Sequence, residues 1–356
     1  MNPHHYAVVV GIDKYPAFSH LNAAQRDAAD FYTWVTDSAG GGVATSSAKL
    51  IPAVAAKSRL TARPTCDEIF EALENAIDSL SLSFDRDPGT WKESRLYLFV
   101  AGHGIAPKAR DAALLAANAD KRHINEHISA ESLLEYFSRV QHFRELVIFA
   151  DCCRTRTDRA TQSAAPWTDD DIRRGNVRKF FAVGADFMNK SYEEIEGPPE
   201  ERRGYFTRAL LDGLRGGAEK TARGQIGSTA LKTYIEGHMQ RNSEKRFLKP
   251  LQPDFIDEGR GGDVLFGPPL SVATARAAAA EAPRRYPVQL KIDMPELAAV
   301  EIVGPENTAA IRSNGTFHCE LPVGIYEAVP VTGTPPSRQP RNWFFKVTEG
   351  ANEYAF

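Results

Sequence analysis

Residues 96–104 read Leu-Tyr-Leu-Phe-Val-Ala-Gly-His-Gly, and residues 146–154 read Leu-Val-Ile-Phe-Ala-Asp-Cys-Cys-Arg. Each segment begins with an apolar run of strand length, which is typical of parallel strands that are buried on both faces. In a parallel sheet the carboxyl ends of the strands lie together, and ligands bind there. The two segments therefore predict that His103 and Cys153 follow neighbouring strands at the same end of one sheet.

Strand and helix patterns alternate on either side of these two segments. Further apolar runs occur at 6–12 and 180–185. Apolar residues at helical spacing separate the runs, and Thr65 is a good N-cap for the second of these helices. The helices are expected at 22–36, 66–80, 129–140, 204–214 and 229–240. The pattern predicts an α/β fold, a mostly parallel sheet flanked by helices, over residues 1–268.

The last quarter of the chain has a different composition. Residues 269–284 are rich in alanine and are expected to form a linker. Residues 285–356 show alternation and turn signals but no helical period, which predicts a small β-sandwich-like accessory domain. Asn314-Gly315 precedes a strand pattern and predicts the turn of a hairpin there.

Composition excludes several classes of protein. Hydrophobic residues make up 42% of the 356 residues, enough for a sizeable core, so the chain as a whole is not disordered. The 43 basic and 46 acidic residues give a net charge of −3, which does not suggest a nucleic-acid partner. No apolar run approaches the roughly 18 residues of a membrane helix, and no signal peptide is visible. We expect a cytoplasmic protein with no membrane partner.

Cysteine spacing and motifs argue against cofactors. Of Cys66, Cys152, Cys153 and Cys319, two are adjacent and none forms a Cys-x-x-Cys pair. This spacing predicts neither a disulfide framework nor a structural zinc site. No glycine-rich phosphate-binding motif is present, so no nucleotide cofactor is expected. We therefore predict no metal and no cofactor for the chemistry.

The residues after the two central strands suggest nucleophilic catalysis. A cysteine thiolate is a strong nucleophile, and an adjacent histidine can protonate a leaving amine. Cys153 and His103 are the candidates for these roles. The backbone N–H groups of Gly104 and Cys153 are the candidates for stabilising a tetrahedral oxyanion.

The chain resembles the caspase-like cysteine peptidases (clan CD, peptidase family C14), in their metacaspase-like and bacterial branch. The resemblance covers residues 5–267, and its histidine lies 50 residues before its cysteine, as in caspases. It implies a caspase-type fold with a large-subunit-like part at 1–160 and a small-subunit-like part at 180–268. It also implies a dyad of His103 and Cys153, with Cys152 as a packed neighbour. The motifs that carry it are Tyr6–Tyr15, Leu21–Ala28, Leu98–Gly104, Val147–Arg154, Gly204–Gly216 and Leu251–Pro253.

The resemblance further implies an acidic S1 pocket, the site that holds the side chain before the cleaved bond. The metacaspase motifs align Asp27 and Asp151 with its carboxylates, which implies cleavage after Arg, or after Lys. The alternative is structural, with Asp27 as a cap or ion pair and Asp151 hydrogen-bonded to backbone. The chain departs from the motifs at Ala23, Ala24, Arg26 and Ala101, and Arg26 would neutralise the pocket if it turned inward.

Residues 154–179 are expected to form an exposed loop that is cut on activation. The segment is polar, and family members are often processed there. An enzyme made as a weakly active zymogen would be cut in it by itself or by an upstream protease, while the alternative is an uncut, solvated loop. Calcium also stays open, because Asp169–Asp171 carry suitable oxygens. The candidate processing sites are Arg154, Arg156, Arg159, Arg173, Arg174 and Arg178.

Three functions stay open at the level of sequence. The first is an endopeptidase that acts on protein or peptide substrates. The second is a catalytically silent caspase-like scaffold or binding module, and the third is a transferase or ligase on the same dyad. The β domain is expected to bind a partner or to cover the peptidase domain. By resemblance alone, a role in a bacterial stress, cell-death or antiviral pathway is expected.

Overall fold

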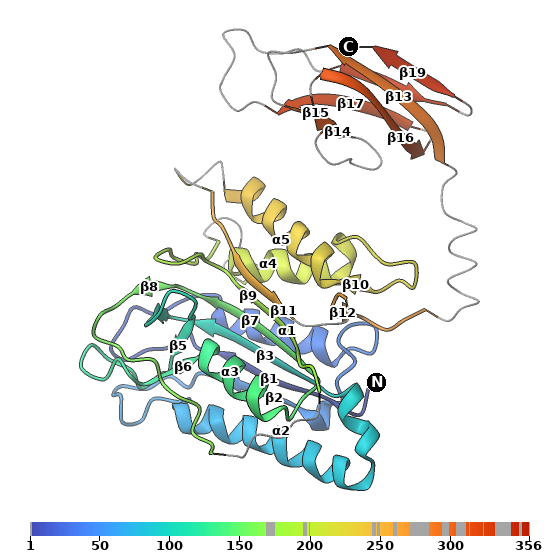
Figure 1. The fold of residues 1–356 in the computed structure, drawn as a ribbon. Helices are drawn as coiled ribbons and strands as arrows, with labels where there is room; N and C mark the ends of the chain where they lie inside the picture. Colours follow the sequence, from blue (N-terminus) through green and yellow to red (C-terminus); the bar gives the residue numbers. More distant parts are fainter. Residues whose placement is uncertain are drawn as a thin grey trace. The chain divides into compact units, whose positions relative to one another are not determined.

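A six-stranded sheet forms the centre of the first of two units into which the chain divides, Met1–Val272 and Ala273–Phe356 (Figure 1). In this computed structural model the described residues are 2–168, 175–194, 198, 200–243, 247, 250–258, 262–270, 285–293, 299–303, 311–312, 314–322, 324–331, 343–348 and 351–355. The predicted Ala-rich linker lies outside them except for Pro269 and Leu270.

The strand order of the sheet is β11-β9-β7-β3-β1-β2, in which all strands are parallel except β11. The predicted class, a mostly parallel α/β sheet flanked by helices, is confirmed. The strands are β1 His5–Gly11, β2 Ala48–Pro52, β3 Arg95–Gly102, β7 Glu145–Cys152, β9 Arg178–Val183 and β11 Asp254–Glu258.

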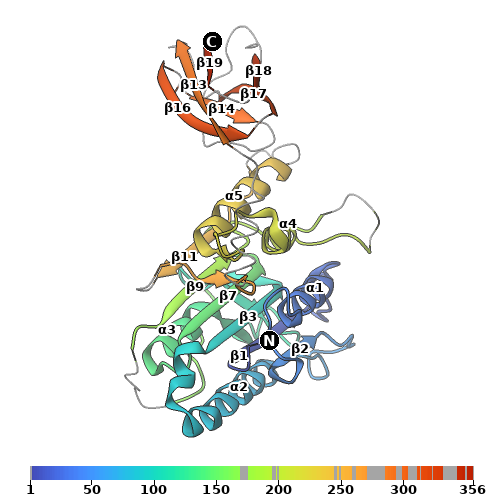
Figure 2. The same cartoon turned by 90° about the vertical axis from the view of Figure 1, so that its right-hand side faces the viewer.

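Five helices cover the two faces of this sheet, and the alternation along each strand assigns residues to the faces. Val8 and Val10 of β1 pack with α2 and α3, whereas Ala7 and Val9 pack with α1, α4 and α5. Figure 2 shows α1 and α2 on opposite sides of the sheet. The helices are α1 Ala24–Thr36, α2 Cys66–Arg86, α3 Ala130–Val140, α4 Tyr205–Asp212 and α5 Ser228–Ser243.

The predicted N-cap of α2 is confirmed. The Thr65 hydroxyl accepts from the Glu68 N–H, and the Glu68 carboxylate accepts from the Thr65 N–H, so the pair forms a capping box. Single-turn segments and short strands complete the unit. These are η1 Thr45–Ser47, η2 Pro88–Glu93, η3 Gly213–Gly217, β4 Gly104–Ala106, β5 Ala113–Leu115, β6 His127–Ser129, β8 Thr155–Arg156, β10 Ile226–Gly227 and β12 Leu265–Phe266.

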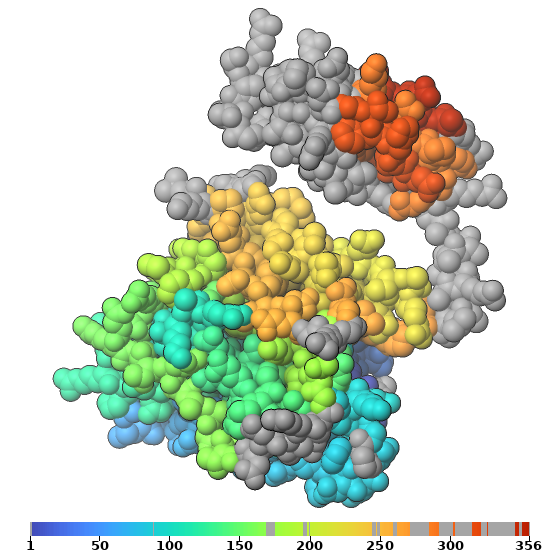
Figure 3. Space-filling model, in the orientation of Figure 1, coloured from blue at the N-terminus to red at the C-terminus, as the bar shows by residue number. Residues whose placement is uncertain are grey.

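The segment 154–179 is more firmly held than its composition suggests. Its first residues form β8, which pairs with β4. The Trp167 ring packs against Phe70, with 5.6 Å between ring centroids, and against two aromatic rings of α3. Green residues that follow Cys153 nevertheless reach the surface in Figure 3, and Arg156 and Arg159 are exposed. The exposed loop expected over 154–179 is therefore anchored to the fold over its first half.

The side chain of Arg154, between β7 and β8, is buried and holds neighbouring segments together. Its side chain is 1% exposed, and its guanidinium donates to the backbone oxygens of Asp111, Ala185 and Ala109 and to the Asp254 carboxylate. Arg178 is likewise buried, in β9, with an ion pair to Asp257. Both side chains are buried, so neither arginine is the exposed processing site that the sequence led us to expect.

All described elements of the second unit are strands, in two sheets of order β16-β13-β19 and β15-β14-β17-β18. Its core contains Val288, Leu290, Ile302 and Tyr326. The Asn-Gly prediction was wrong, since Asn314 and Gly315 open β16 and pair with β13. The strands are β13 Arg285–Asp293, β14 Ala299–Val303, β15 Ile311–Arg312, β16 Asn314–Pro322, β17 Gly324–Val331, β18 Trp343–Val347 and β19 Asn352–Ala355.

Replacing Arg154 should therefore destabilise the folded protein. Arg154→Ala leaves three backbone oxygens without their donors, and we expect it to lower the free energy of unfolding by about 3 kcal/mol or more. The matched control is Arg156→Ala, which removes an exposed arginine two residues away and should change stability little. Urea unfolding of both variants measures the free energy of unfolding. Equal midpoints for the two variants would show that Arg154 does not stabilise the fold.

Candidate active site

The pairing of β3 with β7 brings the predicted dyad together. Gly102, the last residue of β3, lies opposite Cys152, the last residue of β7. His103 and Cys153 follow directly, and both are half-buried. A Cβ at Gly104 would lie 2.5 Å from the Cys153 carbonyl oxygen and 2.7 Å from the Cys152 Sγ. Only glycine therefore lets the chain after His103 lie this close to the nucleophile.

Backbone contacts orient His103. Its Nε2 lies 2.8 Å from the carbonyl oxygen of Ser19, and because a carbonyl only accepts, Nε2 carries the hydrogen. In the neutral ring Nδ1 is then unprotonated and can take a proton. The backbone N–H of His103 donates to the Tyr15 hydroxyl at 3.0 Å, and the Tyr15 ring lies 4.8 Å from the imidazole, centroid to centroid.

The Cys153 thiol is also bound to backbone. Its Sγ donates to the carbonyl oxygen of Ser191 at 3.6 Å, and burial raises the pKa of the thiol. In the described structure the thiol and the imidazole of His103 share no hydrogen bond. In this arrangement the Cys153 thiol is protonated, and it would need a base such as His103 to become a thiolate.

Cys152 is a core residue, although its Sγ lies close to Gly104. Its side chain is 1% exposed and packs in the core that α2 and α3 cover. Burial raises the pKa of its thiol well above the ordinary range, so it stays protonated and unreactive. All four cysteines are free.

Gly204 lies between the two predicted S1 carboxylates. A Cβ at Gly204 would lie 2.0 Å from Asp151 Oδ2 and 3.2 Å from Asp27 Oδ2. Asp27 comes from the first turn of α1, and Asp151 from the end of β7, two residues before the nucleophile. The fold thus gathers both acids around one glycine at the amino end of α4, although they are far apart in sequence.

Both carboxylates are buried, and their partners are internal. Asp151 accepts from the Ser191 hydroxyl at 2.5 Å and from the Thr207 hydroxyl at 2.6 Å. Asp27 accepts from the Gly204 N–H at 3.0 Å, while its Oδ1 has no hydrogen-bond partner among the described residues. Burial raises the pKa of both acids, and each lies near other negative charge. This arrangement makes protonation or a cationic partner favourable.

The nearest described cation to Asp27 is the chain's own Arg203. Its Nε lies 4.0 Å from the unpartnered Asp27 Oδ1 and donates to Asp30 at 2.6 Å. Arg26, which had been considered as a neutralising residue, forms no ion pair with Asp27 in the described structure. The acids are therefore covered by Gly204 and Arg203 rather than open to a substrate.

Several site residues had no signal in the sequence. Ser19 acts through its carbonyl oxygen, which any residue type supplies. Ser191 lies outside the motifs, and Thr207 lies inside Gly204–Gly216 without a recognisable role. No motif indicated Glu193 either, whose carboxylate accepts hydrogen bonds from the backbone N–H groups at the start of α1. Gly204 was inside a quoted motif, but only its neighbours in space show why it is glycine.

Of the remaining predicted processing sites, the structure places only Arg156 and Arg159, which are exposed. Arg173 and Arg174 lie outside the described residues, as do Asp169–Asp171, the possible calcium ligands. Within the described part of the chain no cluster of three His, Cys, Asp or Glu side chains could hold a metal ion. No described helix is long and apolar enough to cross a membrane.

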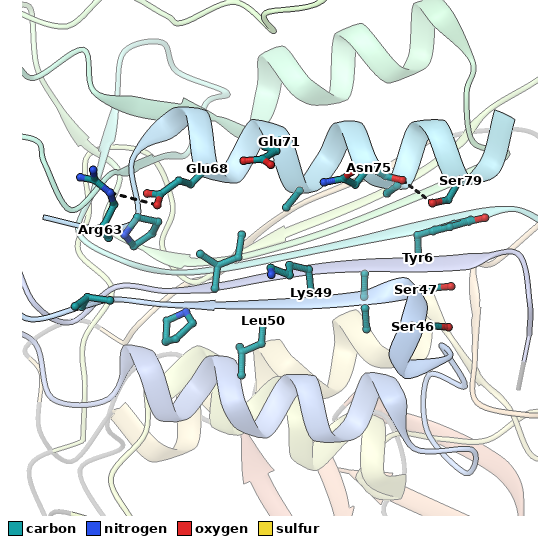
Figure 4. Close-up of a pocket in the computed structure, with 18 residues that line it drawn as sticks. Tyr6, Ser46, Ser47, Lys49, Leu50, Arg63, Glu68, Glu71, Asn75 and Ser79 are labelled. Carbon is teal, nitrogen blue, oxygen red and sulfur yellow. Dashed lines mark hydrogen bonds and ion pairs between the residues drawn. The ribbon is translucent and has the colours of Figure 1, made fainter. Parts of the chain in front are cut away.

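A groove of about 570 Å³ lies between β2, at the edge of the sheet, and α2 (Figure 4). Its labelled side chains include Lys49 and the Arg63–Glu68 ion pair. None of the predicted site residues lines it. It contains no cysteine or histidine, so we do not place the catalytic chemistry there.

Asp27 should make the stability of the protein depend on pH. Because burial raises the pKa of Asp27, the folded chain binds its proton more tightly than the unfolded chain does. Stability contributed by this proton is therefore lost as the pH rises above about 4, where an exposed Asp ionises. Asp27→Asn, which cannot ionise, should gain stability relative to wild type as the pH rises.

Urea unfolding between pH 4 and 8 measures this difference. Asp37→Asn, at an exposed position after the same helix, is the control and should follow the wild-type curve. Parallel curves for wild type and Asp27→Asn would show that Asp27 is not a strained buried acid.

One comparison with known proteins assigns the chain to a family. Residues 4–233 match the family model of the caspase domain. Among solved structures, "structure of pro-sf-caspase-1" matches with a TM-score of 0.41 and 12% identity, over 72% of this chain and 91% of that one. The search of curated proteins found no match. Since the family model spans more than half of the sequence and the predicted dyad follows adjacent strands of the sheet, the chain belongs to the caspase-domain family of cysteine peptidases.

Proposed function

We propose that the protein is a cysteine endopeptidase that uses Cys153 and His103 to cleave after Arg or Lys. One observation supports the basic specificity above all others. Two buried carboxylates, Asp27 and Asp151, lie on either side of Gly204, and Ser191 links this pair to the nucleophile. A pocket with two carboxylates favours a cationic side chain, and a guanidinium can bind both.

The reaction follows from the positions of the donors. His103 Nδ1 takes the Cys153 proton, and the thiolate attacks the carbonyl carbon of the basic residue. The N–H groups of Gly104 and Cys153 stabilise the oxyanion. When the C–N bond breaks, the imidazolium returns its proton to the amine, which leaves an acyl-enzyme. A water molecule that His103 deprotonates then releases the acid and restores the thiol.

We also propose that the described arrangement is a resting state. Gly204 N–H occupies one oxygen of Asp27, and Arg203 lies beside the other, so a substrate guanidinium must displace both contacts. The thiol and the imidazole are likewise engaged with carbonyl oxygens rather than with each other. A cut in the segment after Cys153 would free Arg154–Met188 contacts that hold the site's loops, and so favour the open pocket.

The dyad assignment predicts a sharp difference between the two adjacent cysteines. Cys153→Ala should abolish cleavage of an Arg-terminated fluorogenic peptide, because it removes the nucleophile. Cys152→Ala should retain most of the activity. His103→Ala should lose as much as Cys153→Ala, and the double variant little more, because the two residues act as a unit.

The same peptides with Asp in place of Arg are the control for specificity. Faster cleavage after Asp would contradict the acidic pocket, and exchanged results for the two cysteines would contradict the nucleophile. Wild type that cleaves neither peptide, even after limited proteolysis, would favour the silent scaffold. Transfer of the acyl group to an added amine instead of water would favour a transferase or ligase.

Processing in the segment after Cys153 is the second prediction here. Arg156 and Arg159 are exposed, and exposed segments are where proteolysis concentrates. We expect active protein to contain fragments cut after these residues or after Arg173 or Arg174. A variant with these four arginines changed to Gln should stay intact and weakly active. Intact-mass spectrometry measures the cuts, and full activity in the uncut variant would show that the segment is only a linker.

The wider role rests on the family alone. We propose a cytoplasmic enzyme with protein substrates in a bacterial stress, cell-death or antiviral pathway, activated by itself or by an upstream protease. The described residues of the second unit carry no chemistry that we recognise, and we propose partner binding for it.

A further inference from the structure

Helix α1, which carries Asp27, lacks a cap of its own. Ala23 occupies its N-cap position, and no side chain next to it in sequence accepts a capping hydrogen bond. Glu193 takes this role from 170 residues away. Its carboxylate accepts from the N–H of Ala23 at 2.7 Å and from the N–H of Asn22 at 2.9 Å. A carboxylate is well suited to the N-terminus of a helix, where N–H groups are unpaired.

Residues 189–193, here called the strap, connect this cap to the nucleophile. The Asn189 carbonyl accepts from the Arg154 N–H at 2.9 Å. Ser191 binds the Cys153 thiol through its carbonyl and Asp151 through its hydroxyl. Glu193 then binds the start of α1. Five consecutive residues thus touch the nucleophile, one S1 acid and the helix that carries the other.

Glu193 also lies next to the two S1 acids. It forms a β-bridge with Gly204, the residue between Asp27 and Asp151. Its negative charge contributes to the raised pKa of both aspartates. Two of the nearby cations have acidic partners of their own, since Arg203 binds Asp30 and Arg208 binds Glu194. Three carboxylates therefore gather where the proposed function requires a substrate cation.

We propose that Glu193 is a specificity-determining residue of the S1 pocket, which holds the strap against α1 and supplies a third negative charge for the substrate's guanidinium or ammonium group. This inference rests on the proposed function and deepens it. The bridge places the Glu193 backbone beside Gly204, and the Glu193 side chain is half-buried, whereas Asp27 and Asp151 are buried. Of the three acids, Glu193 is thus the most accessible to an incoming cation.

The test uses Glu193→Gln, which keeps an oxygen for the helix N–H groups but removes the charge. The matched control is Glu201→Gln. Like Glu193, Glu201 precedes Gly204 in the sequence, but it is exposed and its carboxylate has no partner among the described residues. Two readouts are needed in full-length protein. One is kcat and KM for an Arg-terminated peptide, and the other is protection of Cys153 from iodoacetamide by benzamidine, a simple cation.

We expect Glu193→Gln to raise KM for the Arg peptide about 10-fold or more, with kcat nearly unchanged, because a charge-assisted contact is lost. Benzamidine should protect Cys153 in wild type and in Glu201→Gln. In Glu193→Gln, the same protection should require about a 10-fold higher benzamidine concentration. Equal benzamidine protection in all three proteins, or no protection in any, would overturn the inference. A loss in kcat alone would also overturn it, since Glu193 would then only position the strap.

The benzamidine readout separates this inference from the proposed function. If wild type cleaves no basic peptide but benzamidine still protects Cys153 in a Glu193-dependent way, the peptidase proposal fails and the cation site stands. If wild type cleaves after Arg and Glu193→Gln is indistinguishable from it in both readouts, the peptidase proposal stands and the inference about Glu193 fails.

Discussion

The parallel pairing of β3 with β7 is the constraint on which the site depends. Because Gly102 lies opposite Cys152, the next residue of each strand is a candidate catalytic residue. A shift of the register by one residue would turn Cys152 out of the core and Cys153 into it. The pairing is fixed by burial on both faces, since Tyr97, Phe99 and Phe149 pack on one side and Leu98 and Ile148 on the other.

Around this sheet the site is built from backbone contacts across long sequence distances. Ser19 orients His103 from 84 residues away, and Glu193 caps α1 from 170. The proposed S1 acids are buried and accept hydrogen bonds from the strap, from Gly204 and from α4. Burying carboxylates is unfavourable unless they are hydrogen-bonded or paired, and Asp27 is only partly satisfied. A cationic substrate would supply the missing partner, which connects the strain of the resting site to its proposed specificity.

Much of this fold could be predicted from sequence because its strands are continuous apolar runs and its helices have clear periods. The same runs placed His103 and Cys153 at one end of the sheet. The acids Asp27 and Asp151 were predicted from family motifs, and the fold does gather them around Gly204. Arg154 and Arg178 were expected to be exposed, because the sequence alone does not distinguish a buried arginine with internal partners from a solvated one. Ser19 could not be found at all, since its carbonyl carries no residue-type signal.

One measurement tests the central claim most directly. Peptidyl acyloxymethyl ketones that end in Arg or in Asp form a thioether with an activated cysteine. They do so only where the site beside that cysteine binds the terminal side chain of the reagent. After incubation with the protein, peptide mapping by tandem mass spectrometry locates the adduct. The account predicts an adduct of the Arg reagent on Cys153, with none on Cys152 and little from the Asp reagent. Preferential labelling by the Asp reagent, or an adduct on Cys152, would contradict it.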